Sequence, residues 1–108
     1  MKVYNYSHPL TKDLKTDLEE RLGDFQEVRV NVQIDLTRNI VDQVEPLLEG
    51  LIVDMFKGDA LAVIPPSLPS VAYLIGRRVG SLIPGGLPFI WLRRADRSQL
   101  VFEVGGIE

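Results

Sequence analysis

The feature that most constrains this chain is a short, uninterrupted apolar segment near its middle. Residues 60–64 read Ala-Leu-Ala-Val-Ile, and Pro65 and Pro66 follow at once. A continuous apolar run of this length is typical of a central strand covered on both faces, because none of its residues has to face water. Proline lacks the amide proton that a sheet needs, so the strand is expected to end at Ile64.

Other segments carry strand patterns of different kinds. Val28, Val30, Val32 and Ile34 alternate with polar residues up to Asp35, which predicts a strand with one wet face. Further strands are predicted at 2–6, ending at Pro9, and at 89–92, where Trp91 is assigned to the core. Five residues separate 89–94 from an apolar segment at 100–104, and so short a link permits a hairpin but no parallel crossover.

Helical periodicity lies between these strands. Leucines recur every four residues after Thr11, a suitable N-cap, and Gly23 is a suitable terminator. A second helix is predicted from Ile40 to Gly58 with a kink or a restart at Pro46, and a third is expected to have Ser67 as its N-cap and to end at Gly80. The alternation predicts a single minimal Rossmann-like α/β domain over residues 1–108. We expect a mostly parallel sheet of order 2-1-3-4-5, with the last strand antiparallel and helices on both faces.

Composition excludes several classes of site. The 108 residues include no cysteine and one histidine, His8, so a disulfide framework, a thiol nucleophile and a multi-histidine metal site are excluded within one chain. We expect no metal and no cofactor. No apolar run approaches the ~20 residues of a membrane span, and the N-terminal residues lack a signal-peptide pattern. A cytoplasmic protein without membrane association is therefore expected.

The net charge of −3 conceals an asymmetry along the chain. Residues 1–54 carry 6 bases and 11 acids, whereas residues 55–108 carry 6 bases and 4 acids. Five of the later bases are arginines, at positions 77, 78, 93, 94 and 97. The overall charge argues against tracking a long nucleic acid, but the local distribution permits a site for a compact anion.

Ligands of such sheets bind beyond the carboxyl ends of the parallel strands, where the strand order switches. This rule selects the loops after the first, third and fourth strands. They supply the predicted ligand-binding residues Ser7, His8, Pro9, Thr11, Pro66, Ser67, Ser70, Arg93 and Arg94. His8 and Ser67 are the candidate catalytic residues, His8 because imidazole exchanges a proton near neutral pH.

Each of these residues also has a purely structural interpretation. Ser67 could cap a helix, His8 could satisfy a turn before proline, and Arg93 or Arg94 could pair with a carboxylate. Arg77 and Arg78 are assigned to an exposed helix face. The sequence lacks G-x-G-x-x-G, G-K-[ST] and G-x-S-x-G motifs, so the common nucleotide-binding and hydrolytic signatures are absent.

Two segments nevertheless resemble a known family. Asn5-Tyr6-Ser7-His8-Pro9-Leu10-Thr11 before a leucine-striped helix, and Pro65-Pro66-Ser67-Leu68 after a buried strand, resemble small CRISPR-associated accessory proteins of type III systems. These are compact relatives of the CRISPR-associated Rossmann-fold sensors and are grouped with the ring nucleases. The resemblance extends from Tyr4 to about Arg94.

The resemblance implies a homodimer that recognises a cyclic oligoadenylate, chiefly cyclic tetra-adenylate, and assembles further with it in some cases. It implies a role in lowering the antiviral signal, by sequestration or by metal-independent cleavage of this RNA ring. Two alternatives come from other classes. One is a small Rossmann-like interaction or oligomerisation module without a nucleotide ligand, and the other is a protein that binds a mononucleotide.

Overall fold

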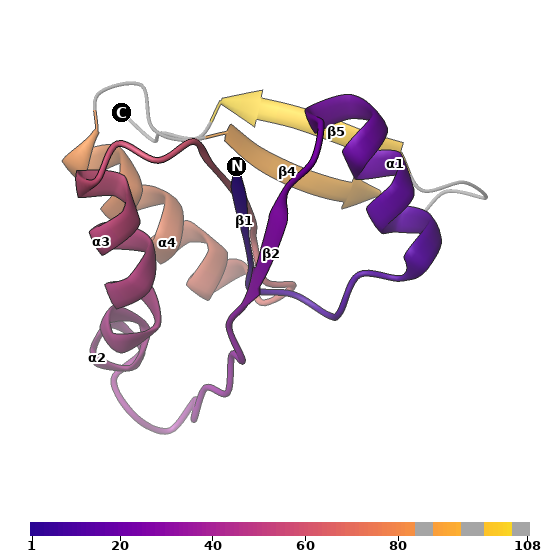
Figure 1. The fold of residues 1–108 in the computed structure, drawn as a ribbon. Helices are drawn as coiled ribbons and strands as arrows, with labels where there is room; N and C mark the ends of the chain where they lie inside the picture. Colours follow the sequence, from indigo (N-terminus) through magenta and orange to yellow (C-terminus); the bar gives the residue numbers. More distant parts are fainter. Residues whose placement is uncertain (84–87, 94–98, 105–108) are drawn as a thin grey trace.

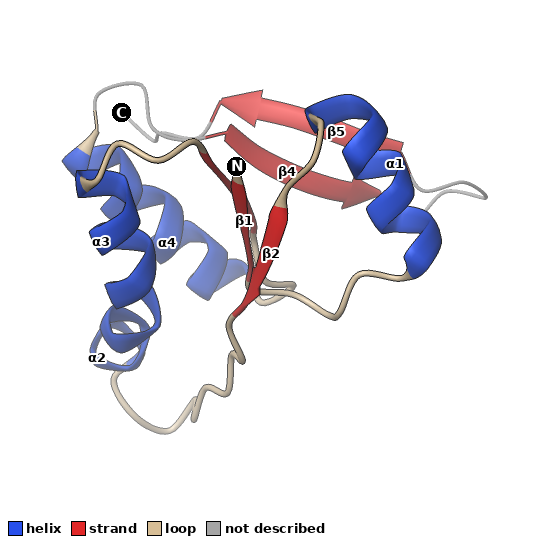
Figure 2. Cartoon of the chain, in the orientation of Figure 1, coloured by secondary structure: helices blue, strands red, loops and turns tan. Residues whose placement is uncertain are grey.

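A sheet of short strands forms the middle of the molecule in the computed structural model, which describes residues 1–83, 88–93 and 99–104 (Figure 1). The strands are β1 (Lys2–Asn5), β2 (Gln26–Arg29), β3 (Leu61–Ile64), β4 (Pro88–Arg93) and β5 (Gln99–Val104). The helices are α1 (Lys12–Leu22), α2 (Ile40–Val44), the 3-10 segment η1 (Glu45–Leu48), α3 (Glu49–Phe56) and α4 (Pro69–Leu82). Figure 2 shows how the helices and strands are distributed.

The strand β1 lies between β2 and β3 and pairs with both in parallel orientation over four residues each. β4 continues the sheet parallel to β3, and β5 pairs with β4 antiparallel, in the order β2-β1-β3-β4-β5. The predicted α/β class is confirmed, as is the parallel arrangement of the strands around β1. Because β1 and β3 run in parallel and in register, the loops that follow them leave the sheet at the same edge.

The two faces of the sheet carry cores of different size. The larger core packs Tyr4, Tyr6 and Val63 against buried side chains of α2, η1, α3 and α4. The smaller core packs Val3, Ala62 and other strand residues against Leu18 of α1. Figure 1 shows α1 on one side of the strands and the other helices on the opposite side. The continuously apolar β3 is therefore buried on both faces, as its sequence predicted.

The residues predicted to begin, end or interrupt the first two helical regions do so in the structure. Thr11 caps α1, its Oγ accepting from the backbone amide of Leu14 at 3.2 Å, and Gly23 ends the helix with a φ of 79°. The predicted interruption at Pro46 is confirmed, because this residue lies in the 3-10 segment η1, which separates α2 from α3. Gly58 follows α3 with a φ of 76°, a conformation that favours glycine. Asn39, which caps α2, was not predicted.

The predicted strand at 28–35 is wrong for most of its length. β2 ends at Arg29, and the last ladder bond runs from the Val30 amide to the Asn5 carbonyl at 3.0 Å. Beyond that point β1 has ended, so no neighbouring strand is left to pair. The alternation still has a physical meaning, because Val30, Val32 and Ile34 are half-buried against the larger core while the residues between them are exposed.

Both predicted limits of the third helix are also wrong. Ser67 is exposed and does not cap α4, which begins at Pro69 with Leu68 in the cap position. Proline suits the first helical position because its missing amide proton has no helical partner there, and this moves the cap to the residue before it. Gly80 does not end the helix, which continues to Leu82. Burial of Leu82 and Ile83 against the larger core outweighs the ~1 kcal/mol cost of an interior glycine.

Candidate functional site

The loops after β1 and β3 meet at the carboxyl edge of the sheet, as the strand order predicted. The Tyr6 amide donates to the Ile64 carbonyl at 3.0 Å, which holds the two chain segments together at the point where both leave the sheet. In Figure 1 this edge lies at the lower end of β1. Polar groups from both loops therefore share one rim of the molecule.

The predicted site residues differ in how they are presented at this rim. His8, Pro9, Ser67 and Ser70 are exposed, Ser7 is half-buried, and Pro66 is buried. Thr11 is exposed, but its hydroxyl oxygen already accepts the capping bond of α1. Ser70 lies in the first turn of α4. The rim thus offers one imidazole and several hydroxyls to solvent.

The predicted arginines are only partly covered by the structure. Arg93 is the last residue of β4, which runs parallel to β3 and pairs with it at Val63 and Phe89, so its backbone lies on the carboxyl side of the sheet, four residues past that pair. Arg94 lies outside the described residues, as do the side chains of Arg93 and Trp91. Arg78 does not reach this rim, because its Nε donates to the Glu45 Oε1 at 3.1 Å and joins α4 to η1. Its neighbour Arg77 is exposed on α4, as predicted.

The residue that organises the rim is Asn5, which sequence reasoning missed. Its side chain is fully buried at the end of β1 and makes three hydrogen bonds. Nδ2 donates to the His8 carbonyl and to the Glu27 Oε2, both at 2.8 Å, and Oδ1 accepts from the Ser7 amide at 2.9 Å. These bonds fix the turn that carries Ser7 and His8. The sequence signal was an asparagine at the end of a strand, because Asn often accepts from the backbone amide two residues later and so forms an Asx turn.

Two charged residues of β2 join the same rim and were also missed. Glu27 is half-buried and holds the Asn5 amide, while Arg29 is exposed and its Nη2 lies 3.4 Å from the Ser7 carbonyl. The guanidinium keeps most of its N–H donors free for an anion, whereas a carboxylate can only accept hydrogen bonds. The rim can thus bind phosphate at one point and a hydroxyl or amine at another.

The opposite face of β1 carries a second polar cluster, Lys2, Tyr4 and Asp54, whose contacts are internal. Asp54 Oδ2 accepts from the Tyr4 hydroxyl at 2.5 Å and from Lys2 Nζ at 3.2 Å. The hydrogen bond from Tyr4 holds the pKa of Asp54 below its usual range, with Lys2 adding to the effect. Burial, and then the bond to Asp54, raise the pKa of Tyr4. These contacts join β1 to α3.

Two cavities in the described part of the chain lie away from the rim. One of about 490 Å³ is at the amino edge, beside Lys2, Gln26 and Asp59. The other, about 340 Å³, lies between α2 and α4 and is lined by apolar residues and the Arg78–Glu45 pair. Neither is lined by a predicted site residue.

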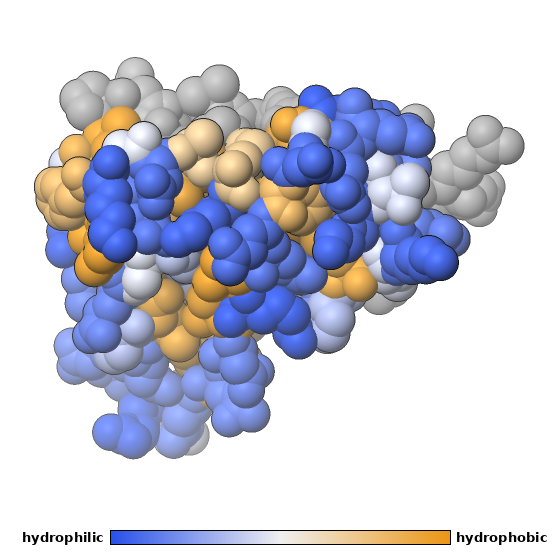
Figure 3. Space-filling view, viewed as in Figure 1, coloured by the Kyte–Doolittle hydropathy of each residue, from blue (hydrophilic) through white to orange (hydrophobic). Residues whose placement is uncertain are grey.

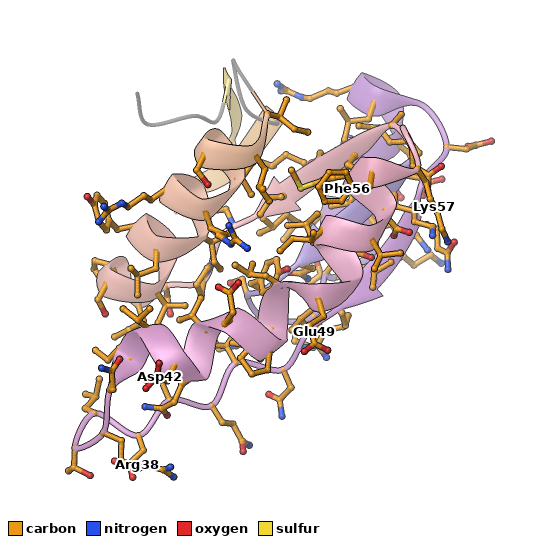
Figure 4. All side chains as sticks on the ribbon, turned by 90° about the vertical axis from the view of Figure 1, so that its left-hand side faces the viewer. Arg38, Asp42, Glu49, Phe56 and Lys57 are labelled. Carbon is orange, nitrogen blue, oxygen red and sulfur yellow. The ribbon has the colours of Figure 1, made fainter. Side chains whose placement is uncertain are left out.

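Hydrophilic residues dominate the face in Figure 3. In Figure 4, Arg38 and Asp42 lie at one end of the α2–α3 region, and Phe56 and Lys57 lie at the other. Within residues 1–83, 88–93 and 99–104 no three carboxylate or imidazole groups gather as metal ligands. None of the helices described there is long and apolar enough to cross a membrane.

A scan against protein-family models and searches of the curated proteins and the solved structures found no match to this chain.

Proposed function

We propose that the protein binds a cyclic oligoadenylate, with cyclic tetra-adenylate as the preferred ring, and thereby lowers type III CRISPR signalling in the cytoplasm. In this proposal the chain is a minimal Rossmann-like domain that acts as a homodimer. The proposal is supported by the resemblance of the segments at 5–11 and 65–68 to small CRISPR-associated accessory proteins. The observation that carries it structurally is the meeting of these same two segments at the carboxyl edge of the sheet.

The size and charge of the rim suit a compact anion. A ring of four nucleotides carries four phosphates within a small volume, and its rotational symmetry matches two copies of one rim related by a two-fold axis. Arg29 supplies an exposed guanidinium beside the Ser7–His8 turn. Exposed hydroxyls of Ser67 and Ser70 and the backbone end of β4 at Arg93 add to the same rim. A long polyanion is disfavoured by the net charge of −3.

The bound ring can be sequestered or cleaved. Cleavage without metal proceeds by attack of a ribose 2′-oxygen on its own phosphorus, with loss of the 5′-oxygen of the next nucleotide and formation of a 2′,3′-cyclic phosphate. The hydroxyl loses one proton and the leaving oxygen gains one, and His8 is the rim residue suited to transfer it. Its backbone is fixed by Asn5 and its side chain is exposed.

Binding is tested by calorimetry with cyclic oligoadenylates of several ring sizes, cyclic tetra-adenylate among them, and with linear tetra-adenylate, AMP and ATP. We expect tight binding of the cyclic ring and a loss of roughly tenfold for Arg29→Gln, because a charged hydrogen bond to phosphate is removed. Lys57→Gln is the matched control, since this exposed cation lies at the end of α3, toward the opposite edge. Absence of binding to every cyclic ring would refute the proposal and favour an interaction module. Preference for AMP or ATP would indicate a mononucleotide site.

Chromatography of the ligand after incubation then separates the two modes of action. Intact ring recovered after denaturation indicates sequestration. Linear products that disappear in His8→Ala, with ring affinity retained, indicate cleavage.

A further inference from the structure

We infer that Glu27 reads the ribose of the bound nucleotide, its carboxylate accepting a hydrogen bond from a 2′-hydroxyl. This inference rests on the proposed function. It adds a second residue of β2, beside Arg29, to a rim whose other expected ligand contacts come from the loops after β1 and β3 and from the end of β4.

The first observation is that Asn5 holds the Glu27 side chain in place. Its Oε2 accepts from Nδ2 of Asn5 at 2.8 Å, and Asn5 is fully buried. The same Nδ2 donates to the His8 carbonyl at 2.8 Å, so the carboxylate lies beside the turn that carries His8. A free glutamate on an edge strand samples many rotamers, and fixing one costs about 1.5–2 kcal/mol of side-chain entropy. Asn5 has already restricted that freedom before any ligand arrives.

The second observation is that the carboxylate has capacity left. Among the described residues, Glu27 has one hydrogen-bond partner, and it uses only Oε2. Glu27 is half-buried, and no unpartnered side-chain oxygen among the described residues is sealed from solvent, so Oε1 is open to a ligand at the rim. An ionised carboxylate accepts hydrogen bonds and donates none, so it selects a donor and repels phosphate. The donors of an oligoadenylate are the ribose hydroxyls and the adenine amino group.

The position of Glu27 favours the ribose. In dinucleotide-binding Rossmann domains, an acidic residue about 20 positions after the turn that follows the first strand binds the ribose 2′-hydroxyl. Glu27 has the corresponding place after the Ser7–His8 turn, although this chain lacks the glycine fingerprint. Arg29, two residues later on the same strand, adjoins the Ser7 carbonyl and can neutralise the neighbouring phosphate. Alternating acid and base along the edge thus match the alternating sugar and phosphate of the ring. The 2′-hydroxyl is also the group that separates RNA from DNA.

The test compares cyclic tetra-adenylate with the same ring made of deoxyadenosine. We expect wild type to prefer the ribose ring, and Glu27→Gln to reduce that preference about tenfold, because a charged hydrogen bond is lost. Glutamine keeps an oxygen for Asn5, and thermal unfolding verifies that the variant is folded. Glu27→Ala is expected to give the same reduction. Glu20→Gln is the charge-matched control on the exposed surface of α1 and should keep the wild-type ratio.

Each outcome has one meaning. Wild type that binds neither ring overturns the proposed function and this inference with it. Wild type that binds the ribose ring, with the affinity for each ring unchanged in both Glu27 variants, overturns the role of Glu27 alone. Equal loss for both rings means that Glu27 contacts the base instead, which also overturns the ribose assignment.

Discussion

Tyr4 and Asn5 are adjacent in β1, point to opposite faces of the sheet and hold different parts of the molecule in place. Tyr4 donates to Asp54 of α3, fifty positions away in the sequence. Asn5 bonds Ser7 and His8, which follow directly, and Glu27 on the neighbouring strand. The polar groups on the Tyr4 face therefore make long-range contacts that join helices to the sheet. Those on the Asn5 face hold a local turn at the rim.

The difference between these two faces separates stability from binding. On the helical face, Tyr6 repeats the arrangement of Tyr4, its hydroxyl donating to the Leu47 carbonyl at 3.1 Å. On the rim face, Leu18 of α1 is the buried helix residue that the described part of the chain supplies to the smaller core, and the turn that Asn5 fixes is partly open to solvent. Variants of the helical face should therefore lower the free energy of unfolding with little effect on ligand affinity. Variants of the rim should change both, or affinity alone.

The largest expected effect is on the helical face, at Leu51 of α3. This side chain is fully buried in the larger core, so Leu51→Ala should lower the free energy of unfolding by about 2–5 kcal/mol. Urea titration followed by circular dichroism measures the loss. Affinity for the cyclic ring should be unchanged where the variant is still folded. Val53→Ala on the exposed side of the same helix is the control, with a change within about 0.5 kcal/mol.

A smaller loss of stability, with a loss of binding, is expected at Asn5. Asn5→Ala leaves the Ser7 amide and the His8 carbonyl without a side-chain partner, which should cost about 1–3 kcal/mol. Hydrogen exchange of the Ser7 amide should accelerate more than that of Val63 in the central sheet. Asn31→Ala, at an exposed position beyond β2, is the control. Unchanged Ser7 exchange with full ring affinity would show that the turn does not depend on Asn5.

How far these two faces could be predicted depends on the range of the interactions. The buried β3, the cap at Thr11 and the break at Pro46 follow from a few neighbouring residues, and the structure confirms them. The end of β2 depends on where β1 stops, which the sequence of β2 does not encode. Its valine alternation predicted the buried face of an extended segment but not its pairing.

The rim was predicted in outline and missed in detail for the same reason. Strand ends and topology placed the loops with His8 and Ser67 at one edge. The link between Asn5 and Glu27 spans 22 positions and depends on the register of β1 against β2, which no local pattern reveals. Ser67 was misassigned because Pro69, two residues later, fixes the start of α4 more strongly than a serine cap does.

The pH dependence of stability should separate Asp54 of the helical face from the rim. Tyr4 lowers the folded-state pKa of Asp54, so this carboxylate stabilises the fold above its ordinary pKa of about 3.9 and the contribution is lost as pH falls below it. Urea titrations at a series of acidic pH values should show a shallower loss for Asp54→Asn than for wild type.

Hydrogen bonds from Thr37 also lower the pKa of Asp35, which is an exposed carboxylate. Asp35→Asn is therefore the control for a surface carboxylate. A loss of stability at acidic pH that is as steep in Asp54→Asn as in wild type would contradict this role of Asp54.

The sign reverses at alkaline pH, because the pKa of Tyr4 is raised in the folded state. The protonated Tyr4 hydroxyl stabilises the fold below its ordinary pKa of about 10, and this contribution is lost as pH rises above it.

The smallest expected effect is at Thr11, where the rim and the start of α1 share one hydroxyl. Thr11→Ala removes the oxygen that accepts from the Leu14 amide, so the free energy of unfolding should fall by about 1 kcal/mol. Thr11→Ser keeps the oxygen and should restore stability, as measured by urea titration. If the hydroxyl serves only the cap, ring affinity in the folded protein is the same for both variants. If Thr11→Ala loses ring affinity that Thr11→Ser retains, the same oxygen also binds the ring. Thr11 would then contribute to both stability and binding, unlike the residues that affect only one of them.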